Sequence, residues 1–498
     1  MKNKIILALI IILTLTFVFS CAADDAETNN NGDSRLKENE NNNEPGAADE
    51  RADSVVIYTD DLGEFDFGDR EFSMFTRLNP RYTSYINVEE QIGEHFHDAM
   101  YTRNRKLEER FNFTFSELMA EDLIQATNNA RKIVLSGDHQ YDIITLTTAG
   151  SLPLVQEGLM HPISLLPHIN LDKPYWNRQL NSDLTVLNKK YFIHGAHDLS
   201  TYDMTHVMLF NKAMVQDLGM DNPYELVNTG KWTFDKFAEM SKMVISDLNG
   251  DGRFDENDRY GLIIPSHYPL PNFWIAAGVK SIEKDENDIP YSAMGEQKFI
   301  DVFQKTFEIT WDINHDSWFG VNLSDLEPIF VTMFENGQGL FLNSTFYYIN
   351  GLRGMETDFG ILPYPKYTES QENYYSRIEN STSALVPVTA DNAVLERASV
   401  ILEALACESL NTVIPAYYDI TLKVKNVRDE ESGEMLDIIF ANRVIDWGDA
   451  VWFADIRNGT FQPMFAANNR NLVSRLERME NIVKKLSDNA VETFEKLD

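Results

Sequence analysis

An acidic loop in the middle of the chain has the residue types and the spacing of a calcium site. In the segment DLNGDGRFDEND, residues 247–258, oxygen-bearing side chains stand at the first, third, fifth, ninth and twelfth positions, and glycine stands at the sixth. Calcium takes about six to eight oxygen ligands, and glycine permits the sharp turn that brings them inward. The predicted ligands are Asp247, Asn249, Asp251, Arg253 through its backbone carbonyl, Asp255 and Asp258.

The alternative for this loop is a polar turn without an ion, because Asn-Gly and Asp-Gly pairs favour tight turns. Asp258 is also shorter than the glutamate that usually supplies two oxygens at the last position, which makes that ligation less secure. Four carboxylates this close would repel each other strongly without a cation. We therefore expect bound calcium, and because the chain has one such loop, we expect the ion to be structural.

Signals for catalysis are weaker. The pairs His95/His97 and His194/His197 have spacings that recur by chance, and no third ligand is obviously paired with them. The sequence contains no G-x-S-x-G, H-E-x-x-H, phosphate-loop or dinucleotide-binding motif. A glycoside hydrolase needs only two carboxylates at a set separation, so the 78 acidic residues leave it open as the enzyme alternative. We expect a protein that is not an enzyme.

Composition limits the partners. The 498 residues include 43 Lys and Arg against 78 Asp and Glu, a formal charge of −35, which phosphate backbones would repel. We therefore expect no nucleic-acid partner. The hydrophobic content of 43% is enough for large cores. The two cysteines, Cys21 and Cys407, exclude a disulfide scaffold, a cysteine-based zinc site and an iron–sulfur cluster.

The N-terminus has the pattern of an export signal. Two lysines precede the apolar run from Ile5 to Phe19, and Ser20 stands before Cys21. This end resembles a bacterial lipobox, which implies a signal peptide over 1–20, cleavage before Cys21 and a lipid on its sulfur. A plain signal peptide or an uncleaved anchor is the alternative. Residues 21–54 predict a disordered polar linker after the lipidated cysteine, so we expect the protein on the outer face of the cell membrane, held by lipid alone.

From residue 55 onward, strands alternate with amphipathic helices, which predicts an α/β architecture. Strands are expected at 70–77, 112–117 and 141–147, with a helix at 89–110. Thr233 is a predicted N-cap. Core-facing stripes are expected on three further helices, at Phe299/Phe303/Phe307, at Leu395/Ala398/Leu402/Leu405, where Cys407 is a buried small hydrophobe, and at Leu472/Leu476/Met479/Val483/Leu486.

Five segments in order along the chain carry a family resemblance. They are YDI at 141–143, LFNK at 209–212, GKWT at 230–233, MFENGQGLF at 333–341 and FGILPYP at 359–365. Each motif alone is weak, but their order across most of residues 72–453 resembles that of the extracellular solute-binding proteins of ABC transporters, in the family 1, carbohydrate-binding branch.

The resemblance implies the type II periplasmic-binding fold, two α/β lobes joined by a hinge that closes on the ligand. By this analogy the N-terminal lobe holds 55–203 and 382–411, and the C-terminal lobe holds 204–381 and 412–498. It also implies a monomer that captures a carbohydrate, most simply an oligosaccharide, and delivers it unchanged to the permease of an ABC importer. A lipid-tethered ectodomain that binds a protein partner on a flat surface is a further alternative.

Sugar rings have apolar faces, on which aromatic side chains stack, and polar edges, which planar side chains bind. For any one aromatic position the alternative is an ordinary core residue. Matching the order of the family's motifs to this chain selects the predicted ligand-binding residues Thr147, Thr148, Asp198, Tyr202, Trp274, Asn343, Phe346, Tyr347, Trp447 and Trp452.

Overall fold

A computed structural model describes most of the chain after the polar N-terminal segment. The predictions for the signal segment 1–20, for Cys21 and for the linker 21–54 lie outside the described residues. The described residues are 56–79, 82–120, 125–265, 268–314, 318–319, 329–349, 351–352, 355–422 and 430–497.

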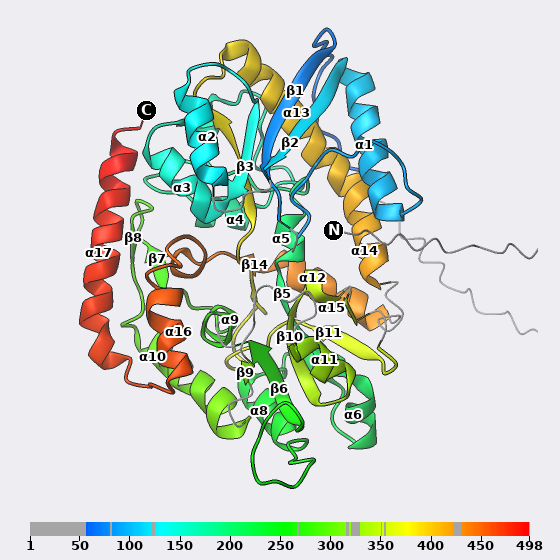
Figure 1. Ribbon diagram of the computed structural model, residues 1–498, viewed down its shortest axis with the longest axis vertical. Helices are drawn as coiled ribbons and strands as arrows, with labels where there is room; N and C mark the ends of the chain where they lie inside the picture. Colours follow the sequence, from blue (N-terminus) through cyan, green and yellow to red (C-terminus); the bar gives the residue numbers. More distant parts are fainter. Residues whose placement is uncertain are drawn as a thin grey trace, which may run out of the picture. The chain divides into compact units, whose positions relative to one another are not determined.

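The first sheet has the strand order β2-β1-β3-β13-β4 (Figure 1). β1 pairs in parallel with β2 and β3, whereas β13 runs antiparallel to β3 and β4. β3 is buried along most of its length, as its continuous apolar run predicts. The strands are β1 (Arg70–Arg77), β2 (Phe113–Ala120), β3 (Ile143–Thr147), β4 (Met160–His161) and β13 (Thr382–Pro387).

Helices pack against this sheet and against one another. α1 contacts both α13 and β2, and α3 contacts β3 and β13. The elements of this region are α1 (His95–Phe111), α2 (Ala126–Leu135), α3 (Thr148–Gln156), η1 (Ile163–Leu165), α4 (Arg178–Asp183) and α13 (Asn392–Glu408).

The second sheet has the order β11-β5-β10-β6-β9 and is also mixed. β10 is antiparallel to β5 and parallel to β6. Its strands are β5 (His206–Asn211), β6 (Tyr260–Pro265), β9 (Trp318–Phe319), β10 (Gly339–Thr345) and β11 (Phe359–Leu362). Around it lie α6 (Lys212–Asp217), α7 (Pro223–Asn228), α8 (Phe234–Lys242), α9 (Pro269–Ala276), α10 (Gln297–Phe307), η2 (Glu308–Ile313), α11 (Ile329–Glu335) and α12 (Phe346–Ile349).

Several segments join the two sheets. The chain passes from one to the other around α5 (Ser200–Asp203), and it returns near the parallel pair β12 (Ser376–Arg377) and β14 (Arg443–Val444). A helical run continues from α13 through η4 (Ser409–Val413) into α14 (Ile414–Leu422), and α15 (Glu430–Ala441) precedes β14. The strands of each sheet fall within the ranges predicted for one lobe, while the exact hinge crossings stay a prediction.

One helical run among the described residues is long and apolar enough to cross a bilayer. It spans Asn392–Tyr418, but 72% of its most apolar window is buried within the structure. Burial of that extent is what a core helix shows, and α13 contacts α1 along its length.

The C-terminal region completes the structure. η5 (Trp447–Val451) packs against α3, and α17 (Val473–Glu495) contacts both α3 and β8. Lys189 Nζ donates a hydrogen bond to the Phe494 carbonyl at 2.8 Å, near the end of α17. The remaining elements here are β7 (Ile282–Lys284), β8 (Pro290–Ser292), η6 (Arg457–Phe461) and α16 (Gln462–Ala466).

Most local predictions are confirmed. Thr233 caps α8, accepting from the Lys236 N–H at 3.3 Å. The phenylalanine stripe of α10 and the apolar stripe of α13 are buried, and burial raises the pKa of Cys407 to about 12. The predicted helix at 89–110 begins later, at His95, because Gly93 has a positive φ of 83° and the Ile92 and Gly93 N–H groups donate to the Asp98 carboxylate.

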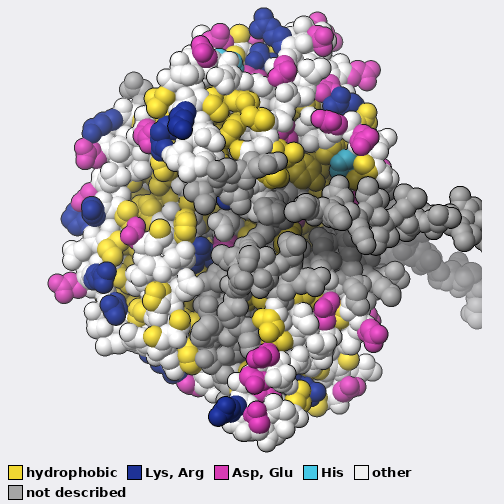
Figure 2. All heavy atoms as spheres, in the orientation of Figure 1, with side chains coloured by type: hydrophobic (Ala, Val, Ile, Leu, Met, Phe, Trp, Pro, Cys, Tyr) yellow, Lys and Arg dark blue, Asp and Glu magenta, His cyan; other side chains and the backbone are white. Residues whose placement is uncertain are grey.

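Charges on the visible surface are mixed. Figure 2 shows Lys and Arg side chains scattered among Asp and Glu on the face in view, without a single large basic patch there.

Candidate functional site

A chain of buried polar side chains links the end of β3 to the segment that runs toward the second sheet. Thr148 Oγ1 lies 3.0 Å from Ser383 Oγ, which lies 3.0 Å from His194 Nε2. His194 Nδ1 lies 3.4 Å from Asp198 Oδ2. The other oxygen of Asp198 accepts from the hydroxyl of Ser200 at 2.6 Å. The predicted residues Thr148 and Asp198 are therefore brought together here.

Ser383, His194 and Asp198 have the connectivity of a nucleophilic triad. With Nδ1–H directed at Asp198, Nε2 would accept from the Ser383 hydroxyl. A nucleophile must reach its substrate, however, and Ser383 is completely buried within strand β13, with its oxygen held between His194 and Thr148. This arrangement is suited to fixing the crossing segment, and it gives no access for an acyl substrate.

A cluster of aromatic rings forms a wall next to this network. The rings of Tyr202 and Phe346 both pack on Phe440, with centroid distances of 5.0 and 4.7 Å. Tyr417 packs on Tyr202 at 5.9 Å and donates to Asp203 at 2.8 Å. The structure thus brings two predicted ligand residues, Tyr202 and Phe346, into one cluster, although they are far apart along the chain.

Arg443 lies on this wall. Its guanidinium carbon is 4.2 Å from the centroid of the Tyr202 ring, a cation–π geometry. Nε donates to the Phe440 carbonyl at 3.1 Å and Nη1 to Thr201 Oγ1 at 3.3 Å. Arg443 is 6% exposed, and among the described residues it forms no ion pair with a carboxylate. A buried charge without a counter-charge is costly, so its presence points to a ligand-facing role.

The wall lines a pocket of about 590 Å³. Tyr202, Phe440 and Arg443 are part of its lining. The lining also includes residues from the first-sheet region, with an aromatic pair and the planar polar groups of the segment before and within α4. These are Asp172, Tyr175, Trp176, Asn177, Arg178 and Gln179.

Tyr175 and Trp176 are held in fixed orientations by Glu403. The Tyr175 hydroxyl donates to this carboxylate at 2.5 Å and the Trp176 indole N–H at 2.8 Å. The backbone of Gly195 passes so close to the indole that a Cβ there would lie 2.6 Å from Trp176 Cε3. The pocket therefore has rigid aromatic sides before any ligand arrives.

A separate network of charges lies on the side of the second sheet. Arg377 binds Asp449 through two nitrogens, at 2.5 and 2.8 Å, and Glu379 at 2.6 Å. Arg457 also pairs with Glu379, at 2.5 Å. Two arginines and two carboxylates are thus buried together with their charges balanced.

This balance fixes the protonation states. Burial alone would raise the pKa of Glu379, but Arg377 and Arg457 outweigh it and hold that pKa well below its ordinary value. Burial and the nearby Arg377 lower the pKa of His206. His206 therefore stays neutral, with Nε2 3.1 Å from Arg377 Nη1 and Nδ1 3.4 Å from Asn343 Oδ1.

The comparisons with solved structures bear on the fold. A cyclo/maltodextrin-binding protein complexed with maltotetraose superposes with a TM-score of 0.53, at 11% identity, covering 88% of this chain and 98% of that one. An ABC substrate-binding protein from Listeria monocytogenes in complex with cycloalternan gives 0.50, at 12% identity, covering 86% and 99%. The GacH receptor of Streptomyces glaucescens, solved unliganded and with acarbose, gives 0.50, at 12% identity, covering 82% and 98%.

The chain has the type II periplasmic-binding fold of ABC-transporter substrate-binding proteins. Each solved structure is covered almost completely, and this chain is covered over 82–88% of its length, so the fold is shared over most of the chain. No protein-family model matches the sequence, and a search of curated proteins finds no match. At identities this low the likeness establishes the predicted fold, and function has to be argued from the site.

The predicted tryptophans of this periplasmic-binding fold lie in the interior. Trp274 packs against Phe299 and Phe461, and its N–H donates to Asp446 at 2.8 Å. Trp447 and Trp452 pack on each other at 5.3 Å, and the Trp447 N–H donates to the Asp183 carbonyl at 2.6 Å. A role for these indoles in binding a ligand stays a prediction.

The other three predicted positions are Thr147, Asn343 and Tyr347. Thr147 is half-buried and caps α3, accepting from the Gly150 N–H at 3.2 Å. Asn343 is buried within strand β10, where its oxygen accepts from Asn272 Nδ2 at 2.7 Å. Tyr347 is half-buried beside Tyr348, with ring centroids 5.2 Å apart. These three contribute to the framework of the site without lining the pocket described above.

The acidic loop 247–258 is folded around its own amides. The two carboxylate oxygens of Asp247 accept from the Gly250 and Gly252 N–H groups at 2.6 and 2.8 Å. Both glycines have positive φ, 74° and 77°, which other residues rarely adopt. Buried Asp258 accepts from Leu248 and Asp255 N–H groups, both at 2.9 Å. Within the described ranges, no group of three or more His, Cys, Asp or Glu side chains is placed to hold a metal ion.

Sequence reasoning missed the pocket residues Arg443, Phe440, Tyr175 and Trp176. A signal for Arg443 was available, since it is the one basic residue in the apolar run IIFANRVIDW at 438–447. A charged residue inside such a run has to be paired or functional when the run is buried. Tyr175 and Trp176 stand between Lys173 and Arg178 in a polar segment, which gives no pattern that separates them from surface aromatics.

Proposed function

We propose that this protein binds a carbohydrate between its two lobes and serves an ABC importer as its extracellular receptor. The observation that carries the proposal is the aromatic pocket with buried Arg443 on its wall. Aromatic faces stack on the apolar faces of sugar rings, and a guanidinium donates to their hydroxyls. Proteins with the same fold have been solved in complex with maltotetraose, cycloalternan and acarbose, which supports an oligosaccharide as the ligand.

The position of the pocket suggests how the ligand acts on the fold. Its lining combines Tyr175 and Trp176 from the first-sheet region with Phe440 and Arg443, which precede and begin β14. A ligand that touches both groups stabilises the closed arrangement by the difference between its affinities for the closed and open forms. The permease would then receive the closed form, and the sugar would be released unchanged.

The proposed roles of individual residues follow from their placement. Tyr202 presents an aromatic face and Arg443 a hydroxyl-binding donor, because the Arg443 Nη2 forms no hydrogen bond with a described residue. Phe346 supports the wall from behind through Phe440. Asp198 and Thr148 hold the crossing segment that carries Tyr202.

The test is direct ligand binding by the purified protein. Maltotetraose, a cycloalternan and acarbose are titrated while intrinsic tryptophan fluorescence and the heat of binding are recorded. We expect saturable binding of at least one of them, weakened about tenfold or more in Arg443→Gln, because a lost charge-assisted hydrogen bond is worth about 1.5–3 kcal/mol. Arg105→Gln, an exposed arginine paired with Glu108 on α1, is the matched control and should bind as the wild type does.

Two further measurements distinguish the proposed receptor from a glycoside hydrolase and from a protein-binding ectodomain. Release of new reducing ends from the bound oligosaccharide would replace the receptor by a glycoside hydrolase, since a receptor returns its ligand intact. Small-angle scattering with and without sugar tests closure, because a hinge that closes lowers the radius of gyration. No change with any glycan, together with binding of a protein partner, would favour a surface ectodomain.

We also propose a lipid anchor at Cys21 that holds the protein on the outer face of the membrane. The supporting observation is the apolar run that ends in Ser20-Cys21, followed by the polar segment to residue 54. Cells expressing the full chain and fed a labelled fatty acid should incorporate the label into the protein, and Cys21→Ala should abolish incorporation. Label retained in Cys21→Ala would contradict the anchor.

Calcium binding by the acidic loop is a further proposal. It is supported by the spacing of Asp247, Asn249, Asp251, Asp255 and Asp258, and by the two glycines with positive φ. A carboxylate oxygen that accepts a loop N–H retains a second lone pair for a cation. Calorimetric titration of the chelated protein should show uptake of one calcium, lost in Asp247→Asn with Asp251→Asn. No uptake at millimolar calcium would refute the proposal.

A further inference from the structure

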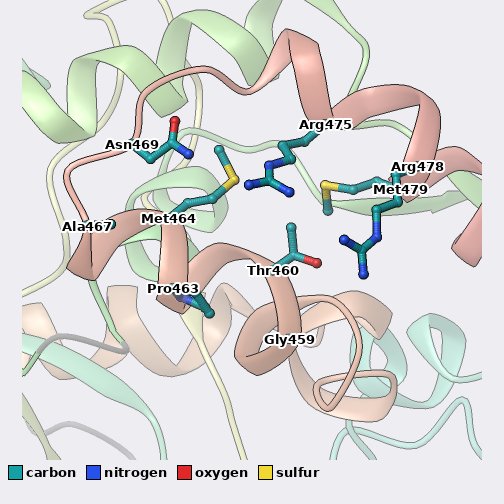
Figure 3. A pocket seen from close by; sticks show the side chains of 9 residues that line it. All are labelled: Gly459, Thr460, Pro463, Met464, Ala467, Asn469, Arg475, Arg478 and Met479. Atoms are coloured by element: carbon teal, nitrogen blue, oxygen red, sulfur yellow. The ribbon is translucent and has the colours of Figure 1, made fainter.

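A second pocket lies far along the chain from the residues discussed so far, between α16 and the first turns of α17. It has a volume of about 220 Å³, well above the ~15 Å³ that one water needs. One part of its lining is apolar, with Pro463, Met464, Ala467 and Met479, and the other part is polar, with Gly459, Thr460, Asn469, Arg475 and Arg478. Figure 3 shows the two arginine side chains reaching from α17 over the pocket, Arg475 toward Met464 and Arg478 toward Thr460.

These two arginines differ from the neighbouring arginines in their ion pairing. Arg470, a few residues earlier, binds both oxygens of Asp312, at 2.6 and 2.7 Å. Arg457 is paired with Glu379 and Asp449. Arg475 and Arg478 form no ion pair or side-chain hydrogen bond with any residue in the described part of the chain. Both arginines are exposed, so their guanidiniums are open to an anion from solution.

The spacing of the pair also matters. Residues three apart on a helix lie on the same face, and like charges there destabilise the helix. Glu477 stands between them in sequence, but neighbours one or two positions away do not share that face. An anion between the two guanidiniums would remove this repulsion.

The rest of the lining supplies hydrogen-bonding groups and an apolar side. The Thr460 hydroxyl donates its one proton to the Asp455 carbonyl at 3.0 Å, so Thr460 contributes no donor to an anion. Asn469 Oδ1 accepts from the Asn471 N–H at 3.1 Å, which leaves its side-chain NH₂ as a donor. Met464 and Met479, both almost fully buried, offer polarisable surface next to the two arginines.

We infer that this pocket binds a small organic oxyanion, a phosphate ester or a carboxylate whose short apolar group packs on the two methionines. Arginine binds such planar or tetrahedral oxygen groups through two parallel N–H donors. The site is separate from the proposed carbohydrate pocket and shares none of its residues. It makes the protein a receptor with a second, anion-responsive position near the N-terminal end of α17.

The test uses the full chain with inorganic phosphate and phenyl phosphate as probes, at constant ionic strength set with sodium chloride. Calorimetry should show saturable binding of phenyl phosphate, about threefold to tenfold tighter than inorganic phosphate because its ring contacts the methionine sulfurs. The double variant Arg475→Gln/Arg478→Gln should bind at least about tenfold more weakly. The charge-matched control Lys484→Gln/Lys485→Gln, on the same helix but outside this pocket, should bind as the wild type does.

Three results would overturn the inference. The first is the absence of saturable binding by either probe, and the second is an equal loss in the lysine control, which would reflect net charge alone. The third is arginine-dependent sedimentation with phosphatidylglycerol vesicles without binding of the soluble probes, which would assign the arginines to a membrane surface. Far-ultraviolet circular dichroism of each variant checks that α17 remains folded, and Arg478→Gln alone should raise the melting temperature slightly by removing the like-charge contact.

Discussion

Two buried arginines in the region between the sheets differ in what surrounds them. Arg377 is 1% exposed and is bound by Asp449 and Glu379, with Arg457 completing a balanced set of four charges. Arg443 is 6% exposed, lies on the ring of Tyr202 and pairs with no carboxylate of the described residues. The first arrangement satisfies every charge within the protein, which suits a structural role. The second leaves a donor directed at a pocket, which suits a ligand.

The largest loss of stability should come from a substitution within the four balanced charges around Arg377. Arg377→Gln leaves Asp449 and Glu379 with fewer counter-charges in the interior, and removal of one partner of a buried pair costs about 3–5 kcal/mol. Urea unfolding followed by circular dichroism measures this loss. A loss below about 1 kcal/mol would mean that the network is solvated in solution, and its contrast with Arg443 would disappear.

The buried His197, which packs on the pocket residue Trp176, should make the stability of the protein depend on pH. His197 packs edge-on against Trp176, with ring centroids 5.6 Å apart, and neither of its ring nitrogens has a hydrogen-bond partner among the described residues. Burial lowers the pKa of His197 from 6.5 to about 4, with Asp198 opposing and His194 and Arg103 assisting the shift.

The sign of the resulting pH dependence follows from linkage. Between pH 6.5 and about 4 the unfolded chain binds a proton that the folded protein excludes, so stability falls as the pH falls through this window. The full effect is up to about 3 kcal/mol. Urea unfolding at pH 7 and pH 4.5 should show a smaller loss in His197→Phe than in the wild type. Parallel losses in both proteins would assign the pH dependence to other groups.

Arg443 should affect binding more than folding. Arg443→Gln is expected to weaken glycan affinity about tenfold or more, while the free energy of unfolding changes by less than about 1.5 kcal/mol, because no buried carboxylate is left unpaired. The two quantities are measured on the same sample by calorimetry and urea unfolding. A large loss of stability with unchanged affinity would place Arg443 in the same structural class as Arg377.

Among these arginine substitutions, the smallest loss of unfolding free energy is expected for an exposed ion pair. Arg470 and Asp312 form a two-nitrogen contact but are 32% and 50% exposed. Arg470→Gln should cost less than about 1 kcal/mol, since solvent screens such pairs. Its unfolding curve, set beside that of Arg377→Gln, separates the effect of burial from that of geometry. Equal costs for the two substitutions would show that burial is not the deciding factor.

The sequence predicted the fold and its elements better than it predicted the pocket. Strand β3, the Thr233 cap and the phenylalanine stripe of α10 follow from local periodicity and capping, which depend on neighbours in sequence. The lobe ranges followed from the order of family motifs, and they contain the strands of the two sheets.

The pocket depends on contacts between residues hundreds of positions apart, which single-sequence patterns do not report. Tyr202 and Phe346 both pack on Phe440, and Trp176 is oriented by Glu403. Trp274 and Trp447 are of a residue type that often binds sugars, but both pack in the interior. Periodicity identifies which residues are apolar, and only tertiary packing decides which of them face a pocket.

The most direct test of the central claim is a crystal structure of the protein with a bound oligosaccharide that calorimetry has shown to bind. The account predicts a sugar ring over Tyr202, a hydroxyl within hydrogen-bonding distance of Arg443, and Trp176 on the opposite side of the same ring. A glycan bound elsewhere, with Arg443 still resting on Tyr202 and no sugar atom near either, would contradict it.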